Sequence, residues 1–298
     1  MVGWLDSVLV RVNGNVRLNV MQSGPKNGPL VILLHGFPEG WYGWRHQVGA
    51  LAEAGFRVLV PNQRGYYLSD KPGPVAAYSL EELMRDVSGL IASAGHDKAY
   101  VIGHDWGGLV AWWLATRRPE KVERFAVLNA PHPLVLLERL RTNAEEIKKS
   151  WYPFYFQIAD LSTSRLRRKN WALLKSMLRQ TVRPDVITEN DLRRYEDIWE
   201  LSNTDVTALN YHRAMLQIPL PTLTNSRLAM PALMLWGAQQ SYYQPQTIQE
   251  SAAYCEAGTV AYVAQAGHWL HHEQPASVNH RLIEFCRQPV PRLEYSFM

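Results

Sequence analysis

Cysteine is scarce in this chain of 298 residues, and its two copies, Cys255 and Cys286, are too few for a disulfide framework. Their spacing fits no metal site, so we predict no metal, and we expect no cofactor. The scarcity of cysteine suits a reducing compartment, and we predict that the protein is cytoplasmic. Long apolar runs are missing as well, because none approaches the roughly 20 residues that a membrane span needs. The first apolar stretch, Val8 to Val10, is cut short by Arg11, which is unlike a signal peptide. We therefore expect no membrane partner.

No sign of charge dominates the chain. Its 31 Lys and Arg residues and 27 Asp and Glu residues give a formal net charge of +4, and both kinds are spread widely. This distribution predicts no nucleic-acid partner. A hydrophobic content of 47% with 19% charged residues is typical of a globular protein, and the length fits one α/β domain with an insertion, or two modest domains.

Glycine is missing from the middle of the chain, since all 19 glycines lie at or before Gly108 or at or after Gly237. Outside this gap, apolar strand patterns alternate with helical ones, which predicts a mostly parallel, eight-stranded-type sheet with helices on both faces. The strands are expected at residues 7–12, 16–21, 30–34, 57–60, 99–102, 125–128, 232–236 and 260–263. Residues 132–228 are rich in helical patterns, so we predict a core domain of residues 1–131 and 229–298 with a helical cap at 132–228.

The motif with most chemical meaning is Gly-His-Asp-Trp-Gly-Gly at residues 103–108, between a strand-like run and a helix-like run. Glycines beside a sharp strand-to-helix turn leave room where side chains would clash, as at the nucleophile elbow of hydrolases. Here the central residue is Asp105, whose carboxylate is ionised at neutral pH and needs no base to attack saturated carbon. The resulting ester is open to water, so alkyl electrophiles such as epoxides and alkyl halides are the expected substrates. The alternative is that Asp105 merely caps the following helix.

Two further motifs supply partners for such a nucleophile. His35-Gly36-Phe37-Pro38 follows an expected strand, and the backbone N–H groups of Phe37 and Trp106 are candidates for an oxyanion hole. His268 follows the last expected strand, which suits a histidine base that activates water.

Together these motifs resemble the epoxide hydrolases of the α/β-hydrolase superfamily. The likeness extends to residues 63–66 (Gln-Arg-Gly-Tyr), 69–72 (Ser-Asp-Lys-Pro), 128–133 (Leu-Asn-Ala-Pro-His-Pro) and 267–269 (Gly-His-Trp). The resemblance implies an α/β-hydrolase fold and a reaction in which the aspartate opens the epoxide, forms an ester and releases a vicinal diol. The implied partners are a small hydrophobic epoxide and water, and both a monomer and a homodimer remain open.

The resemblance also assigns residues. It implies that Asp105 is the nucleophile, that His268 is the base and that Tyr152 is the first of two cap tyrosines that protonate the epoxide oxygen. The second tyrosine would fall on His212, or on Tyr211 if the register shifts by one, and the neighbouring Arg213 favours His212. The residues assigned to the substrate pocket are His35, Pro38, Trp151, Phe156, Tyr211 and Trp269.

The chain departs from the family at the acid that orients the histidine. That acid would fall on Gln240, and the alternative position for it matches Asn129, so both places carry amides. Glu39 and Glu273 lie near the motifs, although spacing alone does not bring either to the imidazole. We therefore expect ester hydrolysis to be slow.

Residues at the expected site also bear on three alternative functions, and they disfavour both kinds of dehalogenase. A haloalkane dehalogenase would carry Asn where Phe37 stands. A fluoroacetate dehalogenase would carry arginines at the positions of Trp106 and Leu109. A binding protein or single-turnover alkyl trap on the same fold stays possible because of Gln240.

Overall fold

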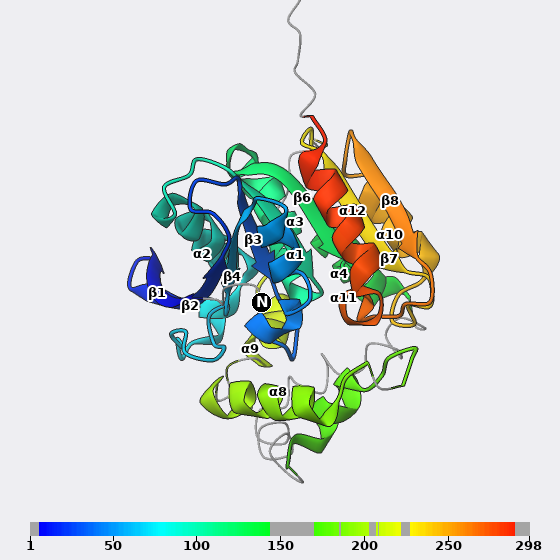
Figure 1. The fold of residues 1–298 in the computed structure, drawn as a ribbon. Coiled ribbons are helices and arrows are strands. Elements are labelled where there is room, and N and C mark those ends of the chain that lie inside the picture. Colours follow the sequence, from blue (N-terminus) through cyan, green and yellow to red (C-terminus); the bar gives the residue numbers. More distant parts are fainter. Residues whose placement is uncertain are drawn as a thin grey trace, which may run out of the picture.

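The computed structural model describes residues 6–143, 170–184, 186–202, 207, 209–221 and 227–289. Its centre is an eight-stranded sheet in the order β1-β2-β4-β3-β5-β6-β7-β8 (Figure 1). The strands are β1 Asp6–Asn13, β2 Val16–Ser23, β3 Leu30–Leu34, β4 Arg57–Pro61, β5 Ala99–His104, β6 Val122–Leu128, β7 Ala232–Gly237 and β8 Gly258–Val263. Strands β1 and β2 pair antiparallel, as do β2 and β4, while the other neighbours are parallel. The predicted fold class is confirmed.

The opening hairpin forms where turn residues separate two runs of alternating pattern. Asn13 pairs with Val16 across the turn, and Gly14 has a φ of +56°, a conformation that glycine adopts without steric cost. The turn therefore sets the register that joins β1 to β2.

Helices cover both faces of the sheet because the central strands are apolar on both sides. Ile32 of β3 packs in a cluster with α2 and α3, whereas its neighbour Val31 packs with α1 and α12. The helices of the core are α1 Val48–Glu53, α2 Leu80–Ser93, α3 Trp106–Arg117, α10 Pro245–Ala252, α11 Leu270–Glu273 and α12 Pro275–Arg287, with 3-10 turns η1 Trp41–Trp44, η2 Val75–Tyr78 and η3 Pro119–Lys121. Cys255 and Cys286 are both free and buried.

Between β6 and β7 the described part of the chain is helical. It contains α4 Pro133–Thr142, a helix over residues 170–178, α8 Glu189–Ser202 and α9 Leu209–Gln217, and no strand apart from a single bridge at Leu228. α8 lies beyond one end of the sheet (Figure 1). The boundaries 132 and 228 of a separate cap stay a prediction.

Polar contacts join α8 to the loop that follows β3. Asp191 accepts a hydrogen bond from the Tyr42 hydroxyl at 2.9 Å and lies 3.1 Å from Nε of Arg45. The Trp199 indole N–H donates to the carbonyl of Pro38 at 2.6 Å. These contacts hold α8 against the segment that contains Phe37 and Pro38. No helix among the described residues is long and apolar enough to cross a bilayer.

Candidate active site

Asp105 sits at the sharp turn between β5 and α3. Its backbone has φ 49° and ψ −119°, a strained conformation for a residue with a side chain. A Cβ on Gly103 would come within 2.2 Å of the Gly107 carbonyl oxygen, and one on Gly107 within 2.0 Å of the Leu34 carbonyl oxygen. The glycines thus permit a turn that aims the carboxylate away from the sheet edge.

The two oxygens of the Asp105 carboxylate have different surroundings. The Phe37 N–H donates to Oδ1 at 3.0 Å, and the backbone N–H of Trp106 also bonds the carboxylate. Oδ2 faces Nε2 of His268 at 3.8 Å. The structure therefore brings together Asp105, His268 and both N–H groups that the sequence suggested for an oxyanion hole.

Burial is the largest influence on Asp105 and raises the pKa of its carboxyl group above the ordinary value. The positive charge of His104 and the two backbone N–H groups oppose that rise. Fixed donors and a neighbouring cation therefore stabilise the ionised form of the nucleophile.

His104 is that cation. Its Nδ1 lies 3.0 Å from Oε2 of Glu39 and its Nε2 lies 3.0 Å from the carbonyl oxygen of His268. Both acceptors lack hydrogens to donate, so both ring nitrogens must carry protons. Burial alone would lower the pKa of His104, but the hydrogen bond and charge of Glu39 raise it overall. A buried imidazolium–carboxylate pair thus adjoins the nucleophile.

Glu39 is the hub of a buried cluster. Its Oε1 lies 3.2 Å from Nε2 of His271 and 2.8 Å from Nε2 of His272, and Nδ1 of His272 faces Arg45 at 2.9 Å. Since arginine only donates, His272 is neutral with its proton on Nε2. Burial would raise the pKa of Glu39, but the surrounding histidines lower it well below the ordinary value.

Three atoms of this cluster have the chemistry of metal ligands, namely Glu39 Oε1 and the Nε2 atoms of His271 and His272, which lie within 4.8 Å of one another. Each already takes part in a hydrogen bond within the cluster. The three atoms therefore already form a hydrogen-bonded support for His104, while Nδ1 of His271 is buried without a partner among the described residues.

His268 presents its two ring nitrogens to different neighbours. Nε2 faces Asp105, while Nδ1 lies 3.0 Å from Nε2 of the Gln240 amide. Burial and the positive charge of His104 hold the pKa of His268 well below its usual value. The imidazole is therefore neutral, and Gln240 is the side chain that orients it.

The other candidates for a relay acid are engaged elsewhere. Nδ2 of Asn129 donates to the carbonyls of Gly267 and His268, both at 2.8 Å, and its Oδ1 accepts from the N–H of Gly237 at 2.9 Å. Glu273 accepts from the backbone N–H of Gly267 at 2.5 Å. Asn129 and Glu273 shape the loop that carries the histidine, and neither bonds its ring.

His212 and Tyr211 both pack against the ring of Trp106, but only His212 is hydrogen-bonded to it. Nε2 of His212 accepts a hydrogen bond from the Trp106 indole at 2.9 Å, and its ring meets that of Phe37 edge-on at 5.0 Å. The Tyr211 hydroxyl instead donates to the carbonyl of Arg64 at 2.8 Å. The geometry favours His212 as the partner of the site.

Among the residues assigned to the substrate pocket, Trp151 and Phe156 lie outside the described residues, as does Tyr152. The His35 ring is fully buried, and its nitrogens meet the Gly36 carbonyl at 2.9 Å and the Gln63 N–H at 3.1 Å. It therefore holds the turn before Phe37, and its place in the substrate pocket stays a prediction.

Pro38 offers its carbonyl to Trp199, as described above. Trp269 packs beside His268 with ring centroids 4.8 Å apart, and its indole donates to the Met177 carbonyl at 3.1 Å. It supports the ring of the base from behind the site.

Glu39 was visible as a carboxylate near the motifs, but its grouping with His104, His271 and His272 was not predicted from the sequence. The run Leu-His-His-Glu at residues 270–273 was visible, but nothing local indicates that it meets a carboxylate about 230 positions earlier. Nor was Tyr242 predicted, whose backbone N–H donates to Oε1 of Gln240 at 3.0 Å.

Known proteins match nearly the whole chain. Residues 29–275 match the family model of the alpha/beta hydrolase fold. The AB hydrolase superfamily protein YfhM of Bacillus subtilis is 38% identical, over 93% of this chain and 96% of its own. Epoxide hydrolase A of Mycobacterium tuberculosis is 31% identical, over 93% of this chain and 96% of its own. The chain belongs to the epoxide hydrolases of the α/β-hydrolase superfamily.

A solved epoxide hydrolase has the same architecture. A mutant of the enzyme from Bacillus megaterium, complexed with its product (R)-3-[1]naphthyloxy-propane-1,2-diol, is 28% identical and has a TM-score of 0.84. The match covers 94% of this chain and 100% of that one.

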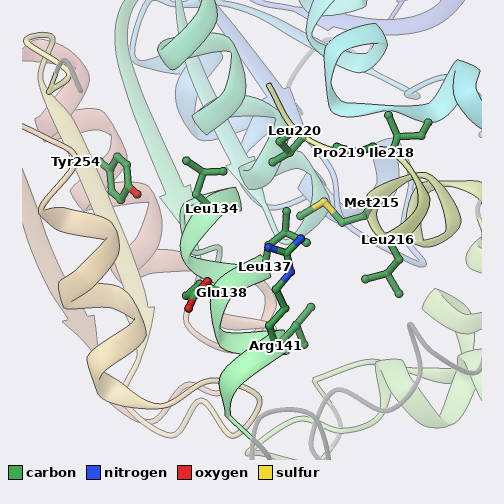
Figure 2. Close-up of a pocket in the computed structure, with 11 residues that line it drawn as sticks. Leu134, Leu137, Glu138, Arg141, Met215, Leu216, Ile218, Pro219, Leu220 and Tyr254 are labelled. Carbon is green, nitrogen blue, oxygen red and sulfur yellow. The ribbon is translucent and has the colours of Figure 1, made fainter. Parts of the chain in front are cut away.

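A separate groove of about 510 Å³, lined mostly by apolar side chains together with Glu138 and Arg141, lies between α4 and the last turn of α9 with the segment that follows it. Figure 2 shows Leu134 and Leu137 of α4 on one side and Met215 and Leu220 on the other. None of the site residues described above lines it, so this epoxide hydrolase has an apolar hollow apart from the nucleophile.

Proposed function

We propose that this chain hydrolyses small hydrophobic epoxides to vicinal diols through an ester on Asp105. The observation that carries the proposal is the position of the Asp105 carboxylate, with Oδ1 on the Phe37 N–H and Oδ2 turned toward His268. The names of its relatives support the same reaction, and a vicinal diol is the named product of the enzyme from Bacillus megaterium.

The first step is ring opening. Oδ2 of Asp105 attacks one ring carbon, the bond from that carbon to the epoxide oxygen breaks, and the oxygen takes a proton from a donor in the cap. In this scheme His212, which contacts both Phe37 and Trp106, is one donor, and Tyr152 is its partner by resemblance. The product is a hydroxyalkyl ester.

The second step is hydrolysis of that ester. Water attacks the ester carbonyl carbon while Nε2 of His268 takes its proton, and the charge that develops on Oδ1 is stabilised by the N–H groups of Phe37 and Trp106. Collapse of the intermediate frees the diol, which receives the proton from His268, and leaves Asp105 as a carboxylic acid. Its remaining water proton is released and replaces the one that the cap donor gave up in ring opening, which restores the Asp105 carboxylate.

Gln240 makes the second step the weak one. An amide provides no negative charge to stabilise the imidazolium that forms when water is deprotonated. For this reason a single-turnover alkyl trap is the second candidate function. Dehalogenation stays disfavoured, because Phe37 stands where a halide-binding Asn is expected.

Intact-protein mass spectrometry with 1-naphthyl glycidyl ether tests the proposal. The adduct should accumulate on His268→Ala, be absent from Asp105→Ala, and form normally on Asp97→Ala, which changes an exposed aspartate. Chromatography of the diol reports turnover. An adduct on Asp105→Ala, or neither adduct nor diol with the unmodified chain, contradicts the proposal.

A further inference from the structure

The Gln240 side chain is held between two groups of the protein. Its Oε1 lies 3.0 Å from the backbone nitrogen of Tyr242, and its Nε2 lies 3.0 Å from Nδ1 of His268. Both contacts have hydrogen-bond length, so the amide bridges the loop after β7 to the histidine.

The backbone nitrogen of Tyr242 decides which way the amide points. A backbone N–H only donates, so its partner must be the carbonyl oxygen of Gln240. Turning the amide over would set the NH₂ group of Gln240 against the N–H of Tyr242, with two donors facing each other. The NH₂ group therefore faces His268.

This orientation fixes the histidine tautomer. Since the NH₂ group of Gln240 donates, Nδ1 of His268 must accept, and a neutral imidazole then carries its hydrogen on Nε2. Nε2 lies 3.8 Å from Oδ2 of Asp105, so this hydrogen is on the side of the ring that faces the nucleophile. A nitrogen that already holds a proton cannot take one from water.

We propose that Gln240 is a positioning residue that holds His268 in the Nε2–H tautomer, so that the alkyl-enzyme ester accumulates. The hydrogen bond from the Tyr242 N–H to Oε1 of Gln240, which we call the clip, fixes the direction of the amide. The inference rests on the proposed function. Ring opening is spared, because Asp105 attacks without a base and a donor on Nε2 is compatible with a carboxylate. Ester hydrolysis must wait until the amide turns over and the imidazole proton moves to Nδ1.

A carboxylate at this position would reverse the tautomer without changing the side chain's shape. In Gln240→Glu, one oxygen still accepts from Tyr242 and the other accepts from Nδ1–H of His268, which leaves Nε2 free to act as a base. In serine proteases, an amide in place of the relay acid costs about ten-thousandfold in turnover, largely through the wrong tautomer.

Nitrogen-15 NMR of histidine-labelled protein tests the tautomer directly and needs no substrate. The spectrum of His268→Asn identifies the signals of this ring by their loss. The unmodified chain should show a protonated Nε2 and a bare Nδ1, and Gln240→Glu should show the reverse. A proton on Nδ1 of His268 in the unmodified chain overturns the inference.

Single-turnover kinetics test the consequence. With excess enzyme and 1-naphthyl glycidyl ether, Gln240→Glu should release the diol from its ester at least about tenfold faster, with alkylation unchanged. Gln239→Glu, which adds the same charge at an exposed neighbour, should match the unmodified chain. An equal gain in both variants, or none in Gln240→Glu, overturns the inference.

A matched pair at Tyr242 tests the clip itself. Tyr242→Pro removes the N–H donor, whereas Tyr242→Ala removes the ring and keeps that donor, so only the proline variant should populate Nδ1–H and hydrolyse the ester faster. If both variants fold and show the same His268 tautomer, the clip is contradicted. If Tyr242→Pro does not fold, the tautomer of His268 in Gln240→Glu tests the inference instead. Failure of the proposed function itself would appear separately, as the absence of any adduct on Asp105.

Discussion

Nδ2 of Asn129 lies 2.8 Å from the carbonyl oxygen of His268, so an amide holds the backbone of the base at one of the two positions where the sequence led us to look for a relay acid. A second bond at 2.8 Å joins the same NH₂ group to Gly267. A carboxylate cannot donate either bond, which gives Asn129 a structural reason to be an amide.

The first prediction is that Asn129→Asp weakens the loop of the base. Asp tolerates the positive φ of 47° at this position about as well as Asn, so the change tests the hydrogen bonds rather than the backbone. Two buried carbonyls would lose their donors, and we expect the free energy of unfolding in urea to fall by about 1–3 kcal/mol. Diol release should not improve. A faster release in this variant would mean that a carboxylate here does reach the imidazole.

The second prediction concerns the bond from the Trp106 indole to Nε2 of His212. Because the Trp106 indole donates to Nε2 of His212, this nitrogen must accept, and the ring is neutral with its proton on Nδ1. Between pH 8 and pH 6 the alkylation rate should therefore gain nothing from a second proton on this ring. Trp106→Phe keeps the backbone N–H but frees Nε2. The alkylation rate of that variant, divided by the rate of the unmodified chain, should therefore rise as the pH falls through this range.

Single-turnover alkylation rates provide the measurement, and the ratio cancels protonation of Asp105, which both proteins share. The double variant Trp106→Phe/His212→Tyr is the control, because a phenol stays protonated throughout this range. A constant ratio in Trp106→Phe would show that the indole does not govern the charge of His212.

The third prediction is a loss of stability in mild acid. Burial lowers the pKa of His35 to about 4, of His132 to about 3 and of His271 to about 4. Each of these histidines stays neutral in the folded protein but takes a proton in the unfolded chain below about pH 6.5. Its contribution to the free energy of unfolding is therefore fully present above that pH and declines as the pH falls toward its pKa in the folded protein. At pH 5 each costs about 2 kcal/mol.

The raised pKa of His104 acts in the opposite sense, since its contribution is present below the ordinary value and is lost as the pH rises through the folded one. The histidines with lowered pKa values, which also include His268 and His272, outnumber His104, so the free energy of unfolding in urea should fall between pH 7 and pH 5. A protein equally stable at both values would refute this account.

His132→Asn is the matched variant for that experiment. The His132 ring caps α4 by accepting from the Leu134 N–H at 3.2 Å, and an Asn oxygen fills the same role without titrating. The variant loses the stack on Tyr254, so its stability at pH 7 should be lower. The difference between pH 7 and pH 5 should nevertheless shrink by about 2 kcal/mol.

The sequence by itself determined the elbow and the sheet. The glycines around Asp105 and the alternation of apolar runs act over a few residues, through local sterics and side-chain periodicity, so both could be predicted. The same reasoning found His268 and the N–H groups of Phe37 and Trp106, because each follows directly from the end of a strand.

Only the tertiary structure decided the electrostatics and the hydrogen-bond directions. Glu39 meets His104 across 65 positions and His272 across 233, and these pairings depend on how the sheet and helices pack. The choice of His212 over Tyr211 depends likewise on tertiary contacts, because the Trp106 indole bonds His212 whereas the Tyr211 hydroxyl bonds the Arg64 carbonyl. The direction of the Gln240 amide depends on a backbone N–H two residues along, whose orientation is set by the folded loop and by no sequence pattern.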